Sequence, residues 1–549
     1  MHTTRFRVTP GVRLSAAFSG TAYAVLLMQT PSKWSFLITG LLALVLLTFL
    51  VFRTELLDRL FAPRHGAVML LAGILSVSAV YTAKSTFYAC CHLWLKRAAV
   101  LLALRHGDLF VRAVPWLAAL AALPMAFGYF LWFTDFMAGF LRRLWRESDF
   151  TERLFLLGAG ILFSMMIVFA YLCTQAFYGA HVGGHWYNFD LIYSSDSGYL
   201  VNQDVFRNVG AEQNDLRQPL YGLFAMPFAQ IAWLLSWLLP FLSRPYITLW
   251  QIMQMGLYLI AVILVSRMMG LRGAEKALFL TLLSVCYPTL IFALSVEQYL
   301  VAVFYLILLI YLRKESPGGS LCFIGATGCL LTSGILFPLV TWDRDLRKFV
   351  KKTALLCLAF FAVTILSGRL TTFLDMPGYI ARYGYYAGGD VDPVRKLMQY
   401  VNFAGACLAA PYSGLDFETL GHASWQLSPV IHWSRIGLLV ISLAVCGVIV
   451  SRKDSFSRIC AAWMGFSLLL LGIVGWGAID NGLMLYTLYF GWAFAAMVFR
   501  FLDWAFRRVR PLKLAVLLAL ILLLVLRNAT ALREVLIFGT RFYPTLGGI

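Results

Sequence analysis

Residues 153–178 read R-L-F-L-L-G-A-G-I-L-F-S-M-M-I-V-F-A-Y-L-C-T-Q-A-F-Y, and no charged side chain follows the opening arginine. An α-helix needs about 20 mainly apolar residues to cross a bilayer, so this stretch predicts a membrane-spanning helix. Twelve further stretches have the same character: 15–30, 35–52, 67–82, 114–138, 246–266, 277–294, 297–312, 352–368, 433–451, 457–475, 482–501 and 512–527. The sequence therefore predicts an all-α, polytopic bundle of about 11–14 transmembrane helices.

The composition of the whole chain agrees with this prediction. Of its 549 residues, 61% are apolar and only 13% are charged, whereas about 25% of a soluble domain is charged. A soluble fold has no place to bury so much apolar surface. This excludes a cytosolic enzyme, a disordered protein, a coiled coil and a small disulfide-linked secreted module. The ten cysteines include no CxxC pair, so neither a zinc nor a redox motif is indicated and no cofactor is predicted.

The distribution of Lys and Arg predicts which loops lie on which side of the membrane. Counted from the 153–178 span, alternate loops carry 22 Lys and Arg residues, while the opposite loops, 179–245 and 369–432, carry seven. Cytoplasmic loops are the ones enriched in these residues, so the loops with 22 are predicted to be cytoplasmic. The net charge of +19 is spread in small clusters. We therefore expect membrane lipids as partners and no nucleic acid.

Three regions are predicted along the chain. Residues 1–150 form an N-terminal transmembrane module, whose first span is retained rather than cleaved as a signal peptide. Residues 151–510 form the core, with the outer loops 179–218 and 369–432, and residues 511–549 form a C-terminal helix and tail. Two apolar segments are irregular. Residues 319–340 are interrupted by glycines and Pro338 and are expected to dip into the membrane as two half-helices. Residues 219–242 are expected to form a helix that is packed at the interface or partly embedded. The topology of 84–112 stays unassigned because basic residues interrupt it.

The outer loop 179–218 holds the densest group of polar residues, and Asp196 is its strongest candidate. Asp196 follows a predicted membrane helix in a stretch of turn and helix-cap formers, S-S-D-S-G. One interpretation is a plain N-cap of a helix over 198–207. The other is a general base at the membrane surface. A metal pair of Asp196 with Asp204 on one helix face is a further alternative.

Five other residues are candidates for substrate binding. Arg217 is either a head-group contact or a clamp on a lipid-linked phosphate. Glu297 is an isolated acid between two apolar runs, where a carboxylate is retained for function or pairing. The group is completed by Asp190, Tyr199 and Arg382.

Two clusters have plainer interpretations. The aromatic cluster around Arg382 is also typical of a membrane-interface belt. His181 and His185 have i,i+4 spacing, but Gly183-Gly184 separates them. We therefore favour interfacial contacts over a zinc pair at these histidines.

These motifs resemble those of the C-type integral-membrane glycosyltransferases, the group of the protein O-mannosyltransferases and the lipid A aminoarabinose transferases. Asp196-Ser197-Gly198-Tyr199 stands where that group has Asp-Glu-x-x-Tyr. Arg217-Gln218-Pro219-Leu220-Tyr221 stands in the place of its Pro-Pro-Leu-Tyr stretch, and residues 295–299 resemble the Ser-x-Glu/Asp start of a later helix. The resemblance covers roughly 153–510. Ser197 replaces the second acid, which weighs against a two-carboxylate or a metal-dependent scheme.

The resemblance implies an inverting sugar transfer from a polyprenyl-phosphate-linked donor to a glycan, lipid or protein acceptor on the extracytoplasmic face. Asp196 would take the acceptor proton and Arg217 would hold the phosphate. The expected location is a bacterial inner membrane. The alternatives are a transporter or flippase for a lipid-linked saccharide, a polysaccharide polymerase or ligase, and a scaffold without catalysis.

Overall fold

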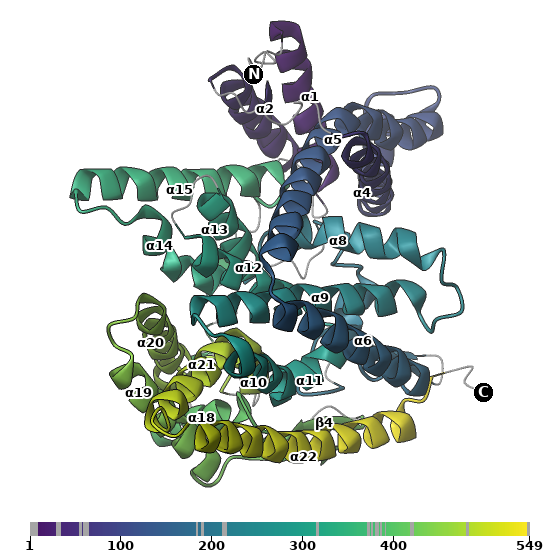
Figure 1. Cartoon of the computed structure of the whole chain (residues 1–549). Helices are drawn as coiled ribbons and strands as arrows, with labels where there is room; N and C mark the ends of the chain where they lie inside the picture. Colours follow the sequence, from purple (N-terminus) through teal and green to yellow (C-terminus); the bar gives the residue numbers. More distant parts are fainter. Residues whose placement is uncertain are drawn as a thin grey trace. The chain divides into compact units, whose positions relative to one another are not determined.

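The computed structural model describes residues 9–28, 35–53, 57–58, 65–182, 185–187, 191–210, 217–313, 318–370, 374, 377–378, 381, 384, 387–389, 391–417, 422–478 and 482–545. Helices dominate this part of the chain (Figure 1). Eight of the helices described there are long and apolar enough to cross a membrane. The chain is therefore an integral, multi-pass membrane protein.

The eight spans are α4 (Gly66–Leu101), α5 (Gly107–Glu147), α6 (Phe150–Cys173), α9 (Pro245–Met268), α15 (Leu346–Leu366), α20 (Ser455–Ser467) with its π-helical continuation (Leu468–Val474), α21 (Thr487–Ala505) with the turn before it, and α22 (Arg510–Phe542). The pair α10 (Gly273–Val285) and α11 (Tyr287–Leu294), bent by 55°, makes a ninth if it is counted as one span.

Fewer helices of spanning length are present in the described residues than the 11–14 predicted, because several apolar stretches form shorter helices. These are α1 (Pro10–Leu26), the apolar part of α2 (Leu37–Phe52), α12 (Tyr299–Leu312) and α19 (Arg435–Val450). The 14 residues of α12 rise only about 21 Å, short of a hydrocarbon core of about 30 Å. Residues 300–310 of α12 are all buried, so this helix packs inside the protein rather than against lipid.

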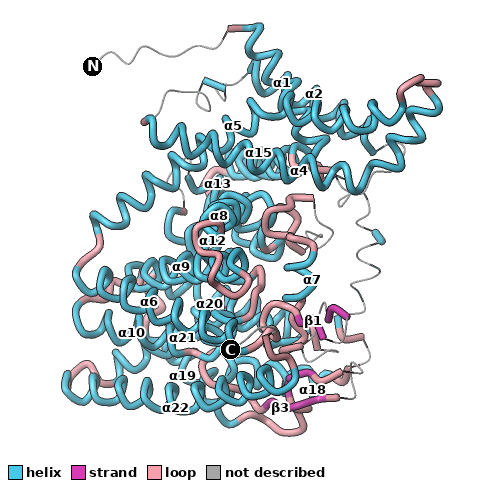
Figure 2. The backbone as a smooth tube through the Cα atoms, turned by 90° about the vertical axis from the view of Figure 1, so that its right-hand side faces the viewer, coloured by secondary structure: helices cyan, strands magenta, loops and turns pink. Residues whose placement is uncertain are grey.

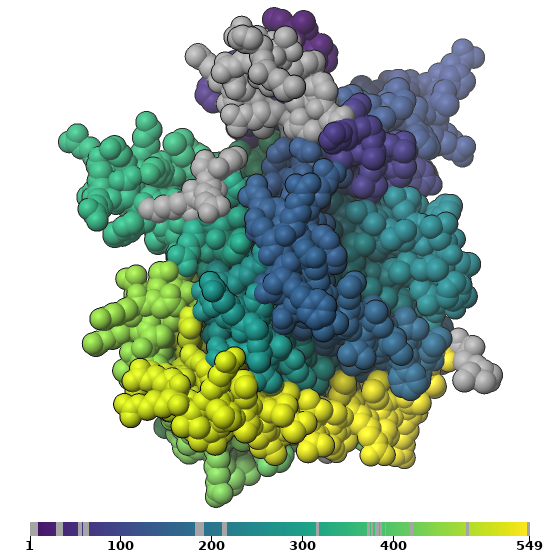
Figure 3. All heavy atoms as spheres, in the orientation of Figure 1, coloured from purple at the N-terminus to yellow at the C-terminus, as the bar shows by residue number. Residues whose placement is uncertain are grey.

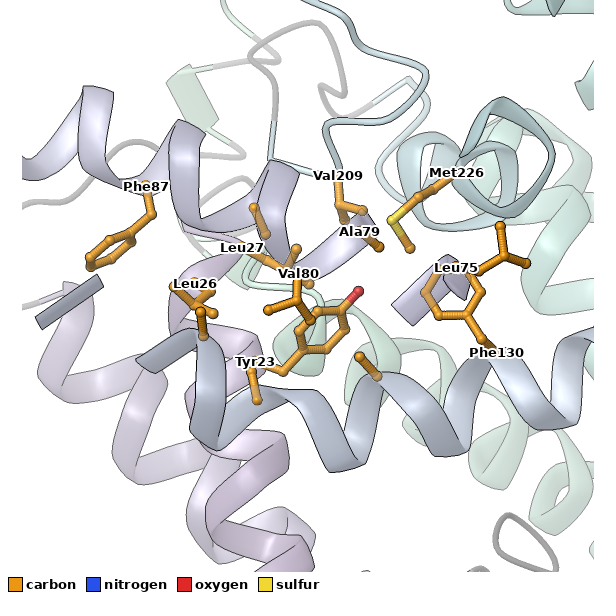
Figure 4. Packing of buried hydrophobic residues seen from close by; sticks show 14 of the residues in the cluster. Tyr23, Leu26, Leu27, Leu75, Ala79, Val80, Phe87, Phe130, Val209 and Met226 are labelled. Atoms are coloured by element: carbon orange, nitrogen blue, oxygen red, sulfur yellow. The ribbon is translucent and has the colours of Figure 1, made fainter. Parts of the chain in front are cut away.

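The chain forms two compact units. The first comprises residues 1–147, 203–234 and 312–376. In it α4 packs along α5, and α1 packs along α2 and α5. Tyr23, Val80, Phe130 and Met226 belong to one buried apolar cluster (Figure 4). α8 (Tyr221–Ser236) joins this core through a hydrogen bond between Ser78 Oγ and Gln230 Oε1 (2.6 Å).

The irregular segment of the first unit breaks near its middle. α13 (Gly318–Cys329) ends there, and a 3₁₀ helix (Leu331–Leu336) and α14 (Pro338–Thr341) follow. The break is confirmed, although the second half is a 3₁₀ turn and a short helix rather than one half-helix. A Cβ on Gly328 would lie 2.5 Å from Leu220 Cβ, so only glycine permits this approach. The segment before α8 therefore lies against the break.

The second unit comprises residues 148–202, 235–311 and 377–549. It contains α6, α7 (Ser197–Asn202), α9–α12 and α18 (Pro393–Ala406) to α22. α6 packs along α9, α19 along α21, and α10 along α22. Two antiparallel hairpins, β1 (Ala180–Val182) with β2 (His185–Tyr187) and β3 (Ser413–Asp416) with β4 (Ser424–Leu427), lie in its loops (Figure 2). One long face of α22, in yellow, is uncovered in Figure 3.

Ion pairs join helix ends within the second unit. Glu152, in the first turn of α6, accepts hydrogen bonds from Arg267 at the end of α9 (2.6 Å) and from Lys276 at the start of α10 (2.8 Å). Lys513 at the start of α22 pairs with Asp503 near the end of α21 (2.8 Å) and with Glu275 of α10. The starts of α6, α10 and α22 are thus joined to the ends of α9 and α21. All of these ends belong to the loops that the Lys and Arg counts assign to one side of the membrane.

Candidate functional site

A break between two buried helices forms the centre of the candidate site. α11 ends at Leu294 and α12 begins at Tyr299. Glu297 and Gln298, which lie between them, are only 3% and 5% exposed. The last carbonyls of a helix have no partners within it. Here Gln251 Nε2 of α9 donates to Phe292 O (2.7 Å), and Tyr171 OH of α6 donates to Leu294 O (2.7 Å).

The loop after α6 connects this break to Asp196. Val296 N donates to Phe177 O (2.9 Å), so the residue before Glu297 lies on this loop. Two residues further on, Gly179 has φ +90°, and a Cβ added to it would lie 2.4 Å from Gly198 Cα. The first turn of α7 is therefore pressed against the same loop. Asp196 stands just before α7, and its carbonyl oxygen accepts the hydrogen bond of Leu200 N (2.9 Å).

Two carboxylates lie within electrostatic range of one tyrosine in this arrangement. Glu297 and Asp196 both lie close enough to the Tyr299 hydroxyl to interact with it electrostatically. The ring of Tyr299 packs edge-on against Phe292 and Tyr489, with centroids 5.3 and 5.1 Å apart. Glu297 is buried, whereas Asp196 is only partly buried. Carboxylates in different environments suit different tasks, one for positioning and one for proton transfer.

A rigid support holds the chain just before Asp196. Tyr193 N donates to Trp425 O and Trp425 N donates to Leu191 O (both 2.8 Å), so this segment pairs with β4. Tyr193 OH lies 2.5 Å from Tyr287 OH and 3.0 Å from Ser413 Oγ, and burial raises the pKa of Tyr193. Tyr193 and Ser194 have φ values of 53° and 56°, an uncommon conformation outside glycine that functional sites often hold.

The residues of this support could not be identified from the sequence. Tyr193, Tyr287 and Trp425 lie far apart in the chain and belong to no motif. Only the unusual run of turn-forming residues at 194–198 marks the place in the sequence.

Of the other four candidate residues, the structure describes two, Tyr199 and Arg217. Tyr199 lies in α7 and is partly exposed. Arg217 is exposed and belongs to the first unit, where its carbonyl oxygen accepts Leu331 N (2.9 Å) at the end of α13. Its convergence with Asp196 stays a prediction. Asp190 and Arg382 lie outside the described residues.

The predicted pairing of Asp196 and Asp204 on one helix face is wrong. α7 ends at Asn202 rather than at residue 207, and Asp204 follows it with φ 48°. Asp204 Oδ2 instead accepts a hydrogen bond from Arg207 Nε (2.8 Å), and Arg207 lies 4.9 Å from the Trp233 ring centroid. The helix stops early because Asp204 adopts a left-handed conformation that no α-helix contains.

The histidine pair is also not helical. His181 pairs with Trp186 and His185 pairs with Val182 in the β1–β2 hairpin, so the i,i+4 arrangement that a helical zinc pair needs is absent. In the described part of the chain, no group of three or more His, Cys, Asp or Glu side chains is arranged to hold a metal ion.

Comparisons with known proteins give no relative for this chain. No protein-family model, no curated protein and no solved structure matches it.

Proposed function

We propose that the chain is a membrane glycosyltransferase with a C-type core, which transfers a sugar from a polyprenyl-phosphate-linked donor to an acceptor on the outer face of a bacterial inner membrane. The observation that carries the proposal is that Asp196 and Glu297 both lie within electrostatic range of the Tyr299 hydroxyl. Both acids were singled out from the sequence, yet 101 positions separate them. A partly accessible carboxylate such as Asp196 is suited to act as a general base.

In the proposed reaction, the acceptor hydroxyl oxygen forms a bond to the anomeric carbon as the bond from that carbon to the phosphate oxygen breaks. Asp196 accepts the hydroxyl proton, and the polyprenyl phosphate leaves with the bonding electrons. The leaving phosphate needs cationic contact, which we assign to Arg217 and Arg382. Tyr199, Asp190 and Glu297 are assigned to binding of the donor.

One observation favours the second candidate, a transporter for a lipid-linked saccharide. Glu297 is a buried acid between two interrupted helices, and transporters place substrate and ion sites at such breaks. A polysaccharide polymerase or ligase shares the handling of a lipid phosphate, but no described feature favours it.

Reconstituted full-length protein separates these functions. Proteoliposomes receive undecaprenyl-phosphate sugars, labelled on the sugar, with or without an extract of envelope lipids and glycans as acceptor. A transferase moves the label to the acceptor and releases undecaprenyl phosphate only when acceptor is present. A transporter moves the label across the bilayer without acceptor and leaves it on its lipid carrier, which would contradict the proposal.

A further inference from the structure

A cavity of about 460 Å³ lies in the second unit. Its lining residues include none of the residues described above around Tyr299. It is formed by the end of α18, the start of α19 and the middle of α22. Its polar and charged lining includes Asn402, Tyr412, His432, Ser434, Arg435 and Arg527. No Asp or Glu is among the described residues that line it. The described lining of the cavity is therefore positive and contains no carboxylate.

Arg527 is fixed in place at this cavity. Its Nε and Nη2 both donate to Ala410 O, at 3.1 and 2.7 Å. The neighbouring Asn528 accepts from Ala410 N (2.8 Å) and donates to Val285 O and Leu408 O (2.7 and 2.9 Å). The main chain that orients the guanidinium is thus held from both sides. Ala410 uses two of the five guanidinium N–H groups, which leaves three for a ligand.

The two arginines stand where the apolar parts of their helices end. In α22 no charged residue lies between Lys513 and Arg527, a rise of about 21 Å. In α19 Arg435 precedes an uncharged run to Val450, and Arg452 follows at the other end. Lys513 is tied to the ion-paired end of the unit. Arg435 and Arg527 therefore lie at the ends of their apolar runs that face away from the ion-paired end of the unit, and basic residues at such ends can contact lipid head groups.

Apolar side chains flank the cavity on the same two helices. Leu438 and Leu439 of α19, and Leu522, Leu523 and Leu526 of α22, are exposed. One long face of the helix that carries the last three of these leucines, α22, is uncovered in Figure 3. A ligand with its anionic group in the cavity has apolar surface beside it on which acyl or prenyl chains can lie.

We propose that this cavity binds the phosphate head group of an anionic membrane lipid. Two guanidinium groups bind phosphate oxygens in bidentate geometry. The α19 N-terminus, where Ser434 Oγ accepts from Gly437 N (3.1 Å), adds a favourable dipole. The exposed leucines beside the cavity favour a lipid phosphate over a soluble one. This assignment does not depend on the proposed transferase.

Binding to the full-length protein in a neutral detergent tests the assignment. The probe is dioctanoyl phosphatidic acid, and inorganic phosphate and dioctanoyl phosphatidylcholine are compared with it. Arg435→Gln is the deciding variant, because Arg435 is exposed and its loss leaves no buried group without a partner. Arg527→Gln is the second variant, with its thermal unfolding checked. Arg533→Gln, exposed on the same helix, is the matched control.

Loss of one charge-assisted contact should raise the Kd of phosphatidic acid about tenfold or more in Arg435→Gln and in folded Arg527→Gln. Arg533→Gln should stay within about twofold. Unchanged Kd values in Arg435→Gln would overturn the site. Binding of inorganic phosphate as tightly as phosphatidic acid, or equal binding of phosphatidylcholine, would overturn the assignment to an anionic lipid.

Discussion

Gly179 and Gly198 touch backbone to backbone, so that a Cβ on Gly179 would lie 2.4 Å from Gly198 Cα. Gly179 also has φ +90°, a conformation that glycine adopts readily and other residues do not. This contact presses the start of α7, and with it Asp196, onto the loop that bonds Val296. The placement of the candidate base therefore depends on two glycines.

Replacing Gly179 by alanine tests this contact. Gly179→Ala should destabilise the protein by about 2 kcal/mol or more, because the new methyl group meets main chain that cannot move aside and the positive φ becomes strained. Gly158→Ala is the matched control, since Gly158 lies in α6 with no atom near its added Cβ, and helix propensity should make it neutral or slightly stabilising. Thermal unfolding in detergent measures both, and equal melting temperatures would contradict the prediction.

Asn528 should be essential for the stability of the second unit. It is fully buried and forms three hydrogen bonds, to Ala410 N, Val285 O and Leu408 O. Asn528→Leu leaves buried main-chain groups without partners, which costs about 1–3 kcal/mol for each. Denaturation should show a loss of about 3 kcal/mol. Thr530→Ala, on the exposed face of the same helix, should stay within about 0.5 kcal/mol.

The contributions of Glu152 and Lys276 to the free energy of unfolding should depend on each other. Glu152→Gln leaves Arg267 and Lys276 facing a neutral amide, which should cost about 3 kcal/mol, as breaking a buried ion pair does. In the Glu152→Gln protein, Lys276→Met should then lower the free energy of unfolding by less than it does in the parent protein. Glu534→Gln, exposed on α22, is the control. Strictly additive melting shifts in the double-mutant cycle would contradict the coupling.

The acid dependence of stability should include a contribution from Asp149. Partial burial opposes its ionisation, but hydrogen bonds from Lys276 Nζ (2.6 Å) and Glu152 N (2.9 Å) outweigh burial and lower the pKa of Asp149. A lowered folded pKa contributes stability above the unfolded value of about 4. That stability is lost as the pH falls through the folded pKa.

The Asp149→Asn variant isolates this effect, because asparagine keeps the helix cap but does not titrate. Its melting temperature should fall less than that of the parent between about pH 5 and 3. Parallel curves for the two proteins would contradict the assignment.

Uninterrupted apolar runs predicted their helices well. Residues 153–178 and 246–266 correspond to α6 and α9. The failure at 84–112 has a specific cause, since α4 continues to Leu101 and α5 begins at Gly107. Lys84 does not end the helix because its ammonium group lies 4.0 Å from the Trp116 ring centroid of α5, where a cation–π contact stabilises it. A contact of this kind between two helices cannot be predicted from the periodicity of the sequence.

The candidate site was only partly predictable. Asp196 and Glu297 stand out because acids are rare in so apolar a chain. Their common proximity to Tyr299 depends on the bond from Val296 N to Phe177 O and on the glycine contact, both of which join distant segments. The pairing of residues 191–193 with β4 is likewise a tertiary feature.

The rate of sugar transfer by the Asp196→Asn protein tests the central claim most directly. Asparagine keeps the size and capping ability of aspartate but cannot take the acceptor proton. With labelled undecaprenyl-phosphate sugar in proteoliposomes, kcat should fall about 100-fold or more. The melting temperature should not change, and Asp204→Asn, which removes the pairing with Arg207, should keep parental transfer. Transfer by Asp196→Asn at the parental rate would contradict the assignment of the base.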